Sequence, residues 1–296
     1  MNKNPFSIYD FLGYLFPGLI FLTILFWIFH QGKISLVGYF DFYKYIDLLK
    51  KGKDYDWLES TVFIIVASYV TGHVIAYLSS STVEYFTNRL FSYPSHYLLH
   101  NENFTFRGMF SKYFKPFCFG SFVWRILVLL ILFPVSVLML FLGKFLSITS
   151  FVARPLDEYV RNSITNKLNN LSTTLSLDRP DVNSDADYHR IVMHYVYLNI
   201  PNCQRKVDNY VAMYGFLRAI ALIACVVFDY FLIDQIKYSY AIINKVGWDK
   251  CCVDWASVKI FILMLIVANL LYMAFVKFYR RFTLENYMAL LTEKNS

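Results

Sequence analysis

Residues 61–78, TVFIIVASYVTGHVIAYL, decide the fold of this chain. They contain no Asp, Glu, Lys or Arg, and their length approaches the roughly 20 apolar residues that cross a bilayer as a helix. Small side chains recur at every fourth position in this run and just beyond it, at Ser68, Gly72, Ala76 and Ser80. Residues four apart share one face of a helix, and in lipid small residues let two helix backbones come close together. The stripe therefore predicts a packing face, whose partner lies either in the same chain or in another copy.

The composition of the whole chain is typical of a membrane protein. Of its 296 residues, 57% are hydrophobic and 17% are charged, whereas soluble domains average about 25% charged residues. The net charge of +7 is spread over several connecting segments, which favours contact with anionic lipid over a nucleic-acid groove. The five cysteines are scattered and form no Cys-x-x-Cys pair. The sequence therefore predicts neither a disulfide scaffold nor a zinc site.

The apolar runs predict an all-α polytopic membrane protein with four or five transmembrane helices and a helical cytoplasmic cap. Pro17 predicts a bend in the first span, because proline removes a backbone hydrogen bond and clashes with the preceding turn. The expected parts are a membrane hairpin with a long second helix (1–90), an interfacial segment with an apolar run (91–146), a soluble helical cap (147–210), and a C-terminal membrane hairpin with a basic tail (211–296).

The number of spans depends on residues 122–146, an apolar run interrupted by Pro134. The run either crosses the membrane or forms a re-entrant hairpin, which is tolerated only where protein or water satisfies the backbone. Lys277, Arg280 and Arg281 directly follow the last span, which predicts a cytoplasmic C-terminus by the positive-inside rule. Four spans with a re-entrant third run are preferred, because both termini and the whole cap then lie in the cytoplasm.

The predicted cap consists of helices. Apolar residues at helical spacing between 156 and 171 indicate one helix. A second helix is expected from 188 to 200, where Pro201 ends it. A third, polar at first and apolar later, is expected from 202 to 234 and returns the chain to the membrane.

Several basic side chains are expected at the membrane surface. Arg107, Lys112 and Lys115 alternate with aromatic residues between 104 and 117. Such a segment either stacks nucleotide bases on its rings or lies on the membrane, where its charges meet lipid phosphates; the second interpretation is preferred. Arg218, one turn inside the apolar part of its helix, is also expected to extend to the headgroups.

His73 is the leading single candidate for a functional residue. It lies in the middle of the second span beside Gly72, and an ionisable group inside a bilayer suggests either an ion pathway or a polar contact. The alternative is a neutral histidine that bonds to another helix. Gly215 and Ala219 form a second small-residue pair and are candidate partners for the face at 68–80. Repeated by the symmetry of a homo-oligomer, that face would line a pore.

The sequence contains no familiar catalytic motif. Gly-x-Ser-x-Gly, His-Glu-x-x-His, the Walker loop and Gly-x-Gly-x-x-Gly are all absent. His96 and His100 have the four-residue spacing of helical metal ligands, but the same stretch offers no clear third ligand. No catalytic residue, metal or cofactor is therefore expected. A lipid-modifying enzyme acting through His73 or Asp229 is the enzymatic alternative.

Three passages carry a resemblance to known proteins: residues 9–18 (YDFLGYLFPG), 92–95 (SYPS) and 210–220 (YVAMYGFLRAI). They look like bacterial inner-membrane proteins encoded beside anti-phage genes, such as the membrane effectors paired with nucleotidyltransferases in the Hailong system. The resemblance implies a homo-oligomeric ion channel gated by a nucleotide or oligonucleotide, or by a nucleotidyltransferase partner. A membrane scaffold that recruits a soluble partner through residues 147–210 is the alternative from another class.

Overall fold

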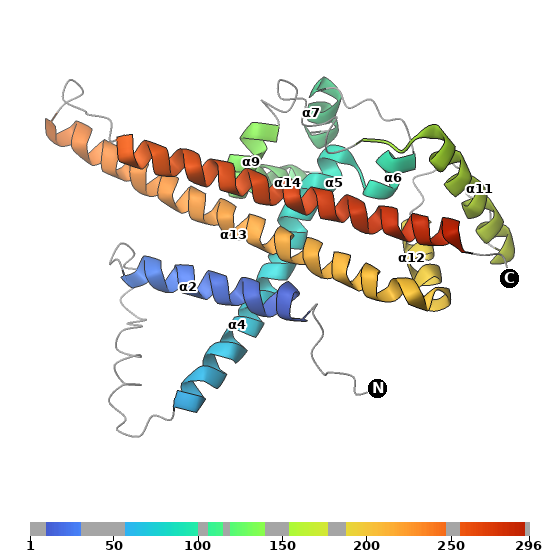
Figure 1. Ribbon diagram of the computed structural model, residues 1–296. Helices are drawn as coiled ribbons and strands as arrows, with labels where there is room; N and C mark the ends of the chain where they lie inside the picture. The colour runs from blue at the N-terminus through green and yellow to red at the C-terminus, as the bar shows by residue number, and fades with distance from the viewer. Residues whose placement is uncertain are drawn as a thin grey trace. The chain divides into compact units, whose positions relative to one another are not determined.

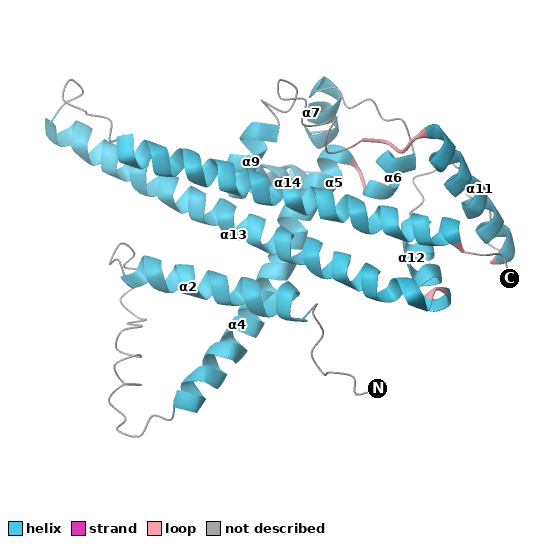
Figure 2. Ribbon diagram, in the orientation of Figure 1, coloured by secondary structure: helices cyan, strands magenta, loops and turns pink. Residues whose placement is uncertain are grey.

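The computed structural model describes residues 10–30, 57–99, 106–114, 119–139, 154–176, 188–246 and 255–293, and all regular secondary structure within these ranges is helical (Figures 1 and 2). The helices are η1 (Phe11–Leu15), α2 (Phe16–His30), α4 (Trp57–Ser79), η2 (Ser80–Glu84), α5 (Tyr85–Phe91), α6 (Pro94–Leu99), α7 (Phe106–Phe114), α8 (Phe119–Ile131), α9 (Phe133–Val137), α11 (Glu158–Thr174), α12 (Tyr188–Asn199), α13 (Pro201–Val246) and α14 (Trp255–Thr292).

Four helical stretches are long and apolar enough to cross a membrane: Phe11–Ile28, Thr61–Leu99, Cys203–Lys237 and Val258–Thr292. The prediction of an all-helical fold is therefore confirmed for the described residues, and these four candidate spans are consistent with a multi-pass membrane protein. Helices α11 and α12 also confirm the two helices predicted between 156 and 200, and α13 continues beyond the predicted end of the third.

The third apolar run does not form a long helix in its described part. Helix α8 has only 13 residues, fewer than the roughly 20 that span a bilayer, and the chain breaks at Leu132 before Pro134. Protein groups satisfy the carbonyls that the break leaves. Ser136 Oγ donates to the Leu129 carbonyl at 3.1 Å, and Asn269 Nδ2 donates to the Pro134 carbonyl at 3.2 Å. Such satisfaction by protein is the condition for an irregular backbone at membrane depth.

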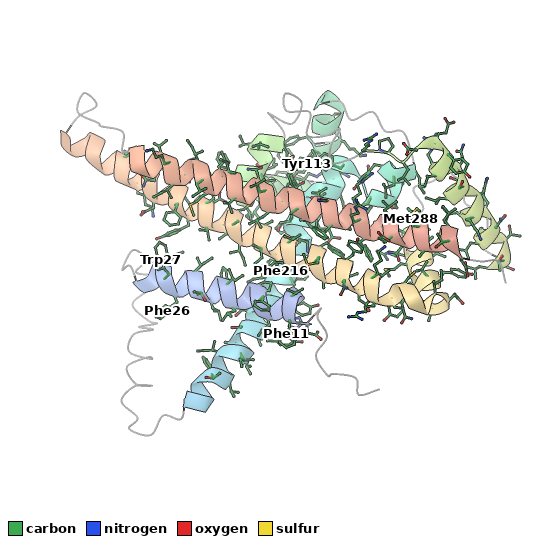
Figure 3. The ribbon with its side chains drawn as sticks, viewed as in Figure 1. Phe11, Phe26, Trp27, Tyr113, Phe216 and Met288 are labelled. Carbon is green, nitrogen blue, oxygen red and sulfur yellow. The ribbon has the colours of Figure 1, made fainter. Side chains whose placement is uncertain are left out.

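Contacts divide the chain into two units, residues 1–78 and 79–296, which are described separately. The first unit contains η1, α2 and nearly all of α4. Its helices expose much of their apolar surface; Phe26 and Trp27 on α2, for example, are 45% and 50% exposed (Figure 3).

Two glycines bring the backbones of the first unit together. A Cβ atom added to Gly18 would collide with the carbonyl oxygen of Ser68, and one added to Gly72 would collide with the carbonyl oxygen of Tyr14. Tyr14 and Gly18 are four residues apart and so lie on one face of their helix, as Ser68 and Gly72 do on theirs. On each of these two faces, the glycine lies against a backbone carbonyl of the other helix. The packing face predicted at Ser68 and Gly72 therefore has its partner in the same chain.

The helix continues through Pro17 by way of a π-helical turn. The amide of Phe16 donates to the carbonyl of Phe11, five residues earlier, where an α-helix would use the carbonyl four residues earlier. Such turns often occur as bulges inside α-helices. The disruption predicted at this proline is therefore a change of hydrogen-bond register, and the helix remains unbroken from Asp10 to His30.

In the second unit, α13 and α14 lie side by side as an antiparallel pair (Figure 1). Ring contacts show the direction. Tyr214 lies 5.3 Å from Tyr279 between ring centroids, and Phe228 lies 4.4 Å from Phe261, so residue numbers rise along one helix as they fall along the other.

Helices α6, α11 and α12, called the cap helices below, pack around the C-terminal part of α14. Ile164 and Leu168 of α11 and Val192 and Val196 of α12 are buried in the same core as Tyr287 of α14. The last described residue, Glu293, also joins the cap helices: its carboxylate accepts a hydrogen bond from the Tyr195 hydroxyl at 2.9 Å, and its carbonyl accepts one from Lys167 Nζ at 3.3 Å. Hydrogen bonding to Glu293, with some desolvation, raises the pKa of Tyr195 above its usual value.

Replacing Gly72 with alanine tests the close approach of the two helices. The added methyl group meets the backbone of Tyr14, so we expect Gly72→Ala to lower the free energy of unfolding by about 1–3 kcal/mol, the usual cost of overpacking. The measurement is unfolding of the full chain in detergent micelles.

Gly215→Ala is the matched control. A Cβ atom at Gly215 meets no atom within 4 Å, and alanine is the better helix former by about 1 kcal/mol. This variant should be as stable as the wild type or more stable. Equal stability of the wild type and Gly72→Ala would contradict the glycine crossing.

Candidate functional site

In the second unit, an ion pair joins two of the helical stretches that are long and apolar enough to cross a membrane. Arg218 of α13 pairs with Glu84 of η2, and their side chains are only 13% and 21% exposed. Arg218 Nε also donates to Ser79 Oγ at 3.2 Å, and Ser80 Oγ donates to the Glu84 carboxylate at 3.3 Å. We call these four residues the Arg218 cluster. It joins α13 to η2 through charge-assisted hydrogen bonds, which are stronger than neutral ones.

A second π-helical turn gives the cluster its geometry. In η2 the amide of Tyr85 donates to the carbonyl of Ser80, five residues earlier. A π turn adds one residue to an α-helix and is often found at functional sites. Here it carries the Glu84 carboxylate and the Ser80 hydroxyl on the same turn, beside the Ser79 hydroxyl that Arg218 reaches.

The electrostatics of the cluster follow from its burial, since the side chains of Arg218 and Glu84 are only 13% and 21% exposed. A buried ionised side chain is costly unless it is paired, and the mutual attraction of Arg218 and Glu84 offsets that cost. The guanidinium carbon of Arg218 also lies 5.9 Å from the ring centroid of Tyr214, within the range of a cation–π contact. Arg218 therefore has partners inside the protein, and its predicted contact with the headgroups stays a prediction.

A neutral polar contact lies beside the cluster. The Thr87 and Tyr272 hydroxyl oxygens are 3.0 Å apart, and Thr87 Oγ1 donates to the Val83 carbonyl at 2.8 Å. Since the Thr87 proton is used there, Tyr272 donates to Thr87. Both side chains are buried. Thus a charged contact at Glu84 joins η2 to α13, and a neutral contact at Thr87 joins α5 to α14. Glu84 and Thr87 are three residues apart in the sequence.

Arg125 and Tyr113 join α8 to α7. The Tyr113 hydroxyl donates to the Arg125 carbonyl, and Arg125 Nη1 donates to the Tyr113 carbonyl, both at 3.0 Å. Burial raises the pKa of Tyr113, and Tyr85 adds to the rise, while the positive charges of Arg125 and Arg89 oppose it. Arg125 is only 3% exposed. Its two hydrogen bonds with Tyr113 give it a structural role.

His73 lies in an aromatic contact within the first unit. Its ring stacks on Tyr14 with centroids 3.8 Å apart, and Tyr69 meets it edge-on at 4.6 Å. Its role as a pore-lining residue stays a prediction. Ala76, the remaining member of the small-residue face, is half-buried.

The other predicted residues are spread over the second unit. Lys112 donates a hydrogen bond from Nζ to Ser92 Oγ, whereas the side chain of Arg107 and all of Lys115 lie outside the described residues. Ala219 is buried, and Gly215 faces open space. Their pairing with the face at 68–80 remains a prediction.

Asp229 is half-buried in α13. Its Oδ1 atom has no hydrogen-bond partner among the residues described. In the same ranges, no group of three His, Cys, Asp or Glu side chains is arranged to hold a metal ion.

The sequence analysis did not identify Glu84 as the partner of Arg218. A signal was present: Glu84 is the only carboxylate in residues 61–99, and Arg218 is the only charged residue between Asp208 and Asp229. Two opposite charges, each isolated in an apolar stretch, favour one another because lipid offers no other counterion.

A double-mutant cycle tests the ion pair. Arg218→Gln or Glu84→Gln alone leaves one largely buried charge unpaired, so each should lower the free energy of unfolding by about 3–5 kcal/mol. The double variant leaves no unpaired charge and should lose less than the sum of the two. The measurement is unfolding in mixed micelles of a mild detergent and SDS.

Lys206→Gln provides the control for this cycle. Lys206 pairs with Glu285 at 2.6 Å, but its side chain is 58% exposed, and exposed pairs contribute about 0–1 kcal/mol. Strict additivity of the two single losses would show that Arg218 and Glu84 do not interact.

Comparison with known proteins assigns this chain to no family. No family model, curated protein or solved structure matches the chain. The contacts of the Arg218 cluster therefore carry the functional argument.

Proposed function

We propose that this protein is a homo-oligomeric ion channel of the bacterial inner membrane, and that the Arg218 cluster stabilises its closed state. The observation that carries the proposal is the ion pair between Arg218 and Glu84 inside two membrane-spanning stretches. Paired charges at this depth are expensive to build and are typical of ion pathways and switches. Separating them would expose polar groups along the contact between α13 and η2.

The connection of α13 to the cap helices supports a gating role. Only Ile200 separates α12 from α13, and Gln204 Nε2 donates to the Tyr197 carbonyl at 2.6 Å across this junction. Since α13 is one continuous helix from Pro201 to beyond Arg218, a displacement of α12 moves the charged end of the ion pair. A ligand that binds the cap helices differently in two states would therefore shift the channel between them.

The biological setting comes from the sequence. Lys277, Arg280 and Arg281 at the end of the last apolar run favour a cytoplasmic C-terminus. The cap helices, which pack against α14, would then lie on the same side of the membrane. The resemblance to anti-phage effectors supports a defence role. The trigger would be a nucleotide, an oligonucleotide or a nucleotidyltransferase partner.

A membrane scaffold is the second candidate function, and one observation favours it. The cap helices expose large apolar side chains, with Tyr159 of α11 83% exposed and Leu198 of α12 77% exposed. Exposed apolar side chains of this size also occur on surfaces that bind proteins. A scaffold would bind its partner through α11 and α12 without conducting ions.

Ion flux through liposomes that contain the purified protein separates the two functions. If the pair stabilises the closed state, Arg218→Gln and Glu84→Gln should each raise the flux at least about tenfold, which corresponds to about 1.4 kcal/mol in the closed–open equilibrium. The charge exchange Arg218→Glu with Glu84→Arg should return the flux toward the wild-type value, and Lys206→Gln should leave it unchanged.

The scaffold predicts a different result. The wild type and all variants would then pass no ions, and a soluble protein would remain bound to the wild type but not to a variant with Leu198→Ser and Tyr159→Ser. That outcome would exclude the channel.

A further inference from the structure

The end of α5 and the helix α7 bring several phosphate-binding side chains together. Lys112 of α7 donates a hydrogen bond from Nζ to Ser92 Oγ, and Ser92 follows the last residue of α5. Arg89 lies in the last turn of α5, which directly precedes Ser92. Both basic side chains therefore come from positions near the same end of α5.

The helix that carries Arg89 packs against the helix that carries Lys112, since α5 contacts α7. Tyr113, the residue after Lys112, is buried, and its hydroxyl is fixed by the Arg125 carbonyl at 3.0 Å. The positive charge of Arg89 opposes the rise in the pKa of Tyr113 that burial causes. The two basic residues thus lie on helices that pack against each other.

Arg89 has unused hydrogen-bonding capacity. It is half-buried, and its Nε atom is shielded from solvent without a hydrogen-bond partner among the described residues. Buried polar groups normally have such a partner, and the exceptions need an explanation such as an unseen ligand. Helices α5, α6, α7 and α8 contain no Asp or Glu, so none of these four helices supplies a counterion for Arg89.

The backbone at Ser92 is unusual. Its φ of 66° and ψ of 175° lie in a region that is essentially open only to glycine and persists only where its surroundings enforce it. This conformation ends α5 and turns the chain into α6, with the Ser92 hydroxyl toward Lys112. Strained residues of this kind are concentrated at ligand sites.

We propose that Arg89, Ser92 and Lys112 bind the phosphate group of a ligand. The planar fork of an arginine, the ammonium of a lysine and a serine hydroxyl are the donors that proteins use for phosphate oxygens. Two sources of this chemistry fit: the headgroup of an anionic phospholipid, and a phosphorylated solute such as a nucleotide. The site stands on its own contacts and does not depend on whether the protein conducts ions.

Titration of the full-length protein in detergent tests the site and identifies the source. The probes are dioctanoyl phosphatidic acid, ATP and inorganic phosphate, with dioctanoyl phosphatidylcholine as the lipid whose phosphate is shielded by choline. Affinities are measured by isothermal titration calorimetry. Binding of phosphatidic acid alone indicates a lipid headgroup site, and binding of ATP or inorganic phosphate indicates a site for a soluble ligand.

Three variants show whether the named side chains hold the phosphate. Arg89→Gln and Lys112→Gln should each weaken binding of the probe at least about tenfold, the usual effect of losing a hydrogen bond to a charged group. Lys237→Gln, which removes an exposed charge from α13, should bind as the wild type does.

Two results would overturn the proposal: none of the phosphate probes binds the wild type, or both Gln variants bind as tightly as the wild type. If Arg89→Gln does not fold, the exposed Lys112→Gln and the charge-conserving Arg89→Lys keep the test valid. Arg89→Lys keeps the positive charge, so it should lose less affinity for the probe than Arg89→Gln.

Discussion

A charge buried among apolar helices needs a countercharge, and the pairing of Arg218 with Glu84 meets this constraint in the second unit. Lipid gives helices no hydrophobic reason to associate, so contacts between polar groups decide which faces meet. Arg218 selects the face of α13 that turns toward η2, and the hydroxyls of Thr87 and Tyr272 do the same for α14 and α5. The long antiparallel pair of α13 and α14 is thereby joined to the helix that ends at Phe91.

In the first unit, the two helices associate through close backbone packing, without a charged contact between them among the described residues. Gly18 and Gly72 each receive a carbonyl of the opposite helix, so the two backbones approach more closely than side chains would otherwise allow. Dispersion between closely packed atoms then replaces the polar contacts used in the second unit. The ring of His73 stacks on Tyr14 at this crossing, which extends the packed surface by one aromatic pair.

The sequence predicted those features that depend on composition and period. Apolar length identified the long helices, and the four-residue recurrence of small side chains identified Ser68 and Gly72 as a packing face. It did not identify Gly18 as the partner, because the choice between helices is made by tertiary packing. The isolated charges of Glu84 and Arg218 were a signal for their pairing, but the geometry of the pair was not predictable. The side chains around Glu84 are presented by a π turn, and hydrophobic periodicity carries no signal for one extra residue.

The π turn at Ser80–Glu84 also makes the length of this helix adjustable by one residue. A π turn closes over five residues and an α turn over about four, and residues four apart share one face of an α-helix. Losing one residue between Ser79 and Glu84 would therefore convert the π turn to an α turn and still leave both residues on one side, within reach of Arg218. Related sequences that keep the charged pair should therefore tolerate a one-residue deletion at this turn, with the rest of the helix unchanged in register.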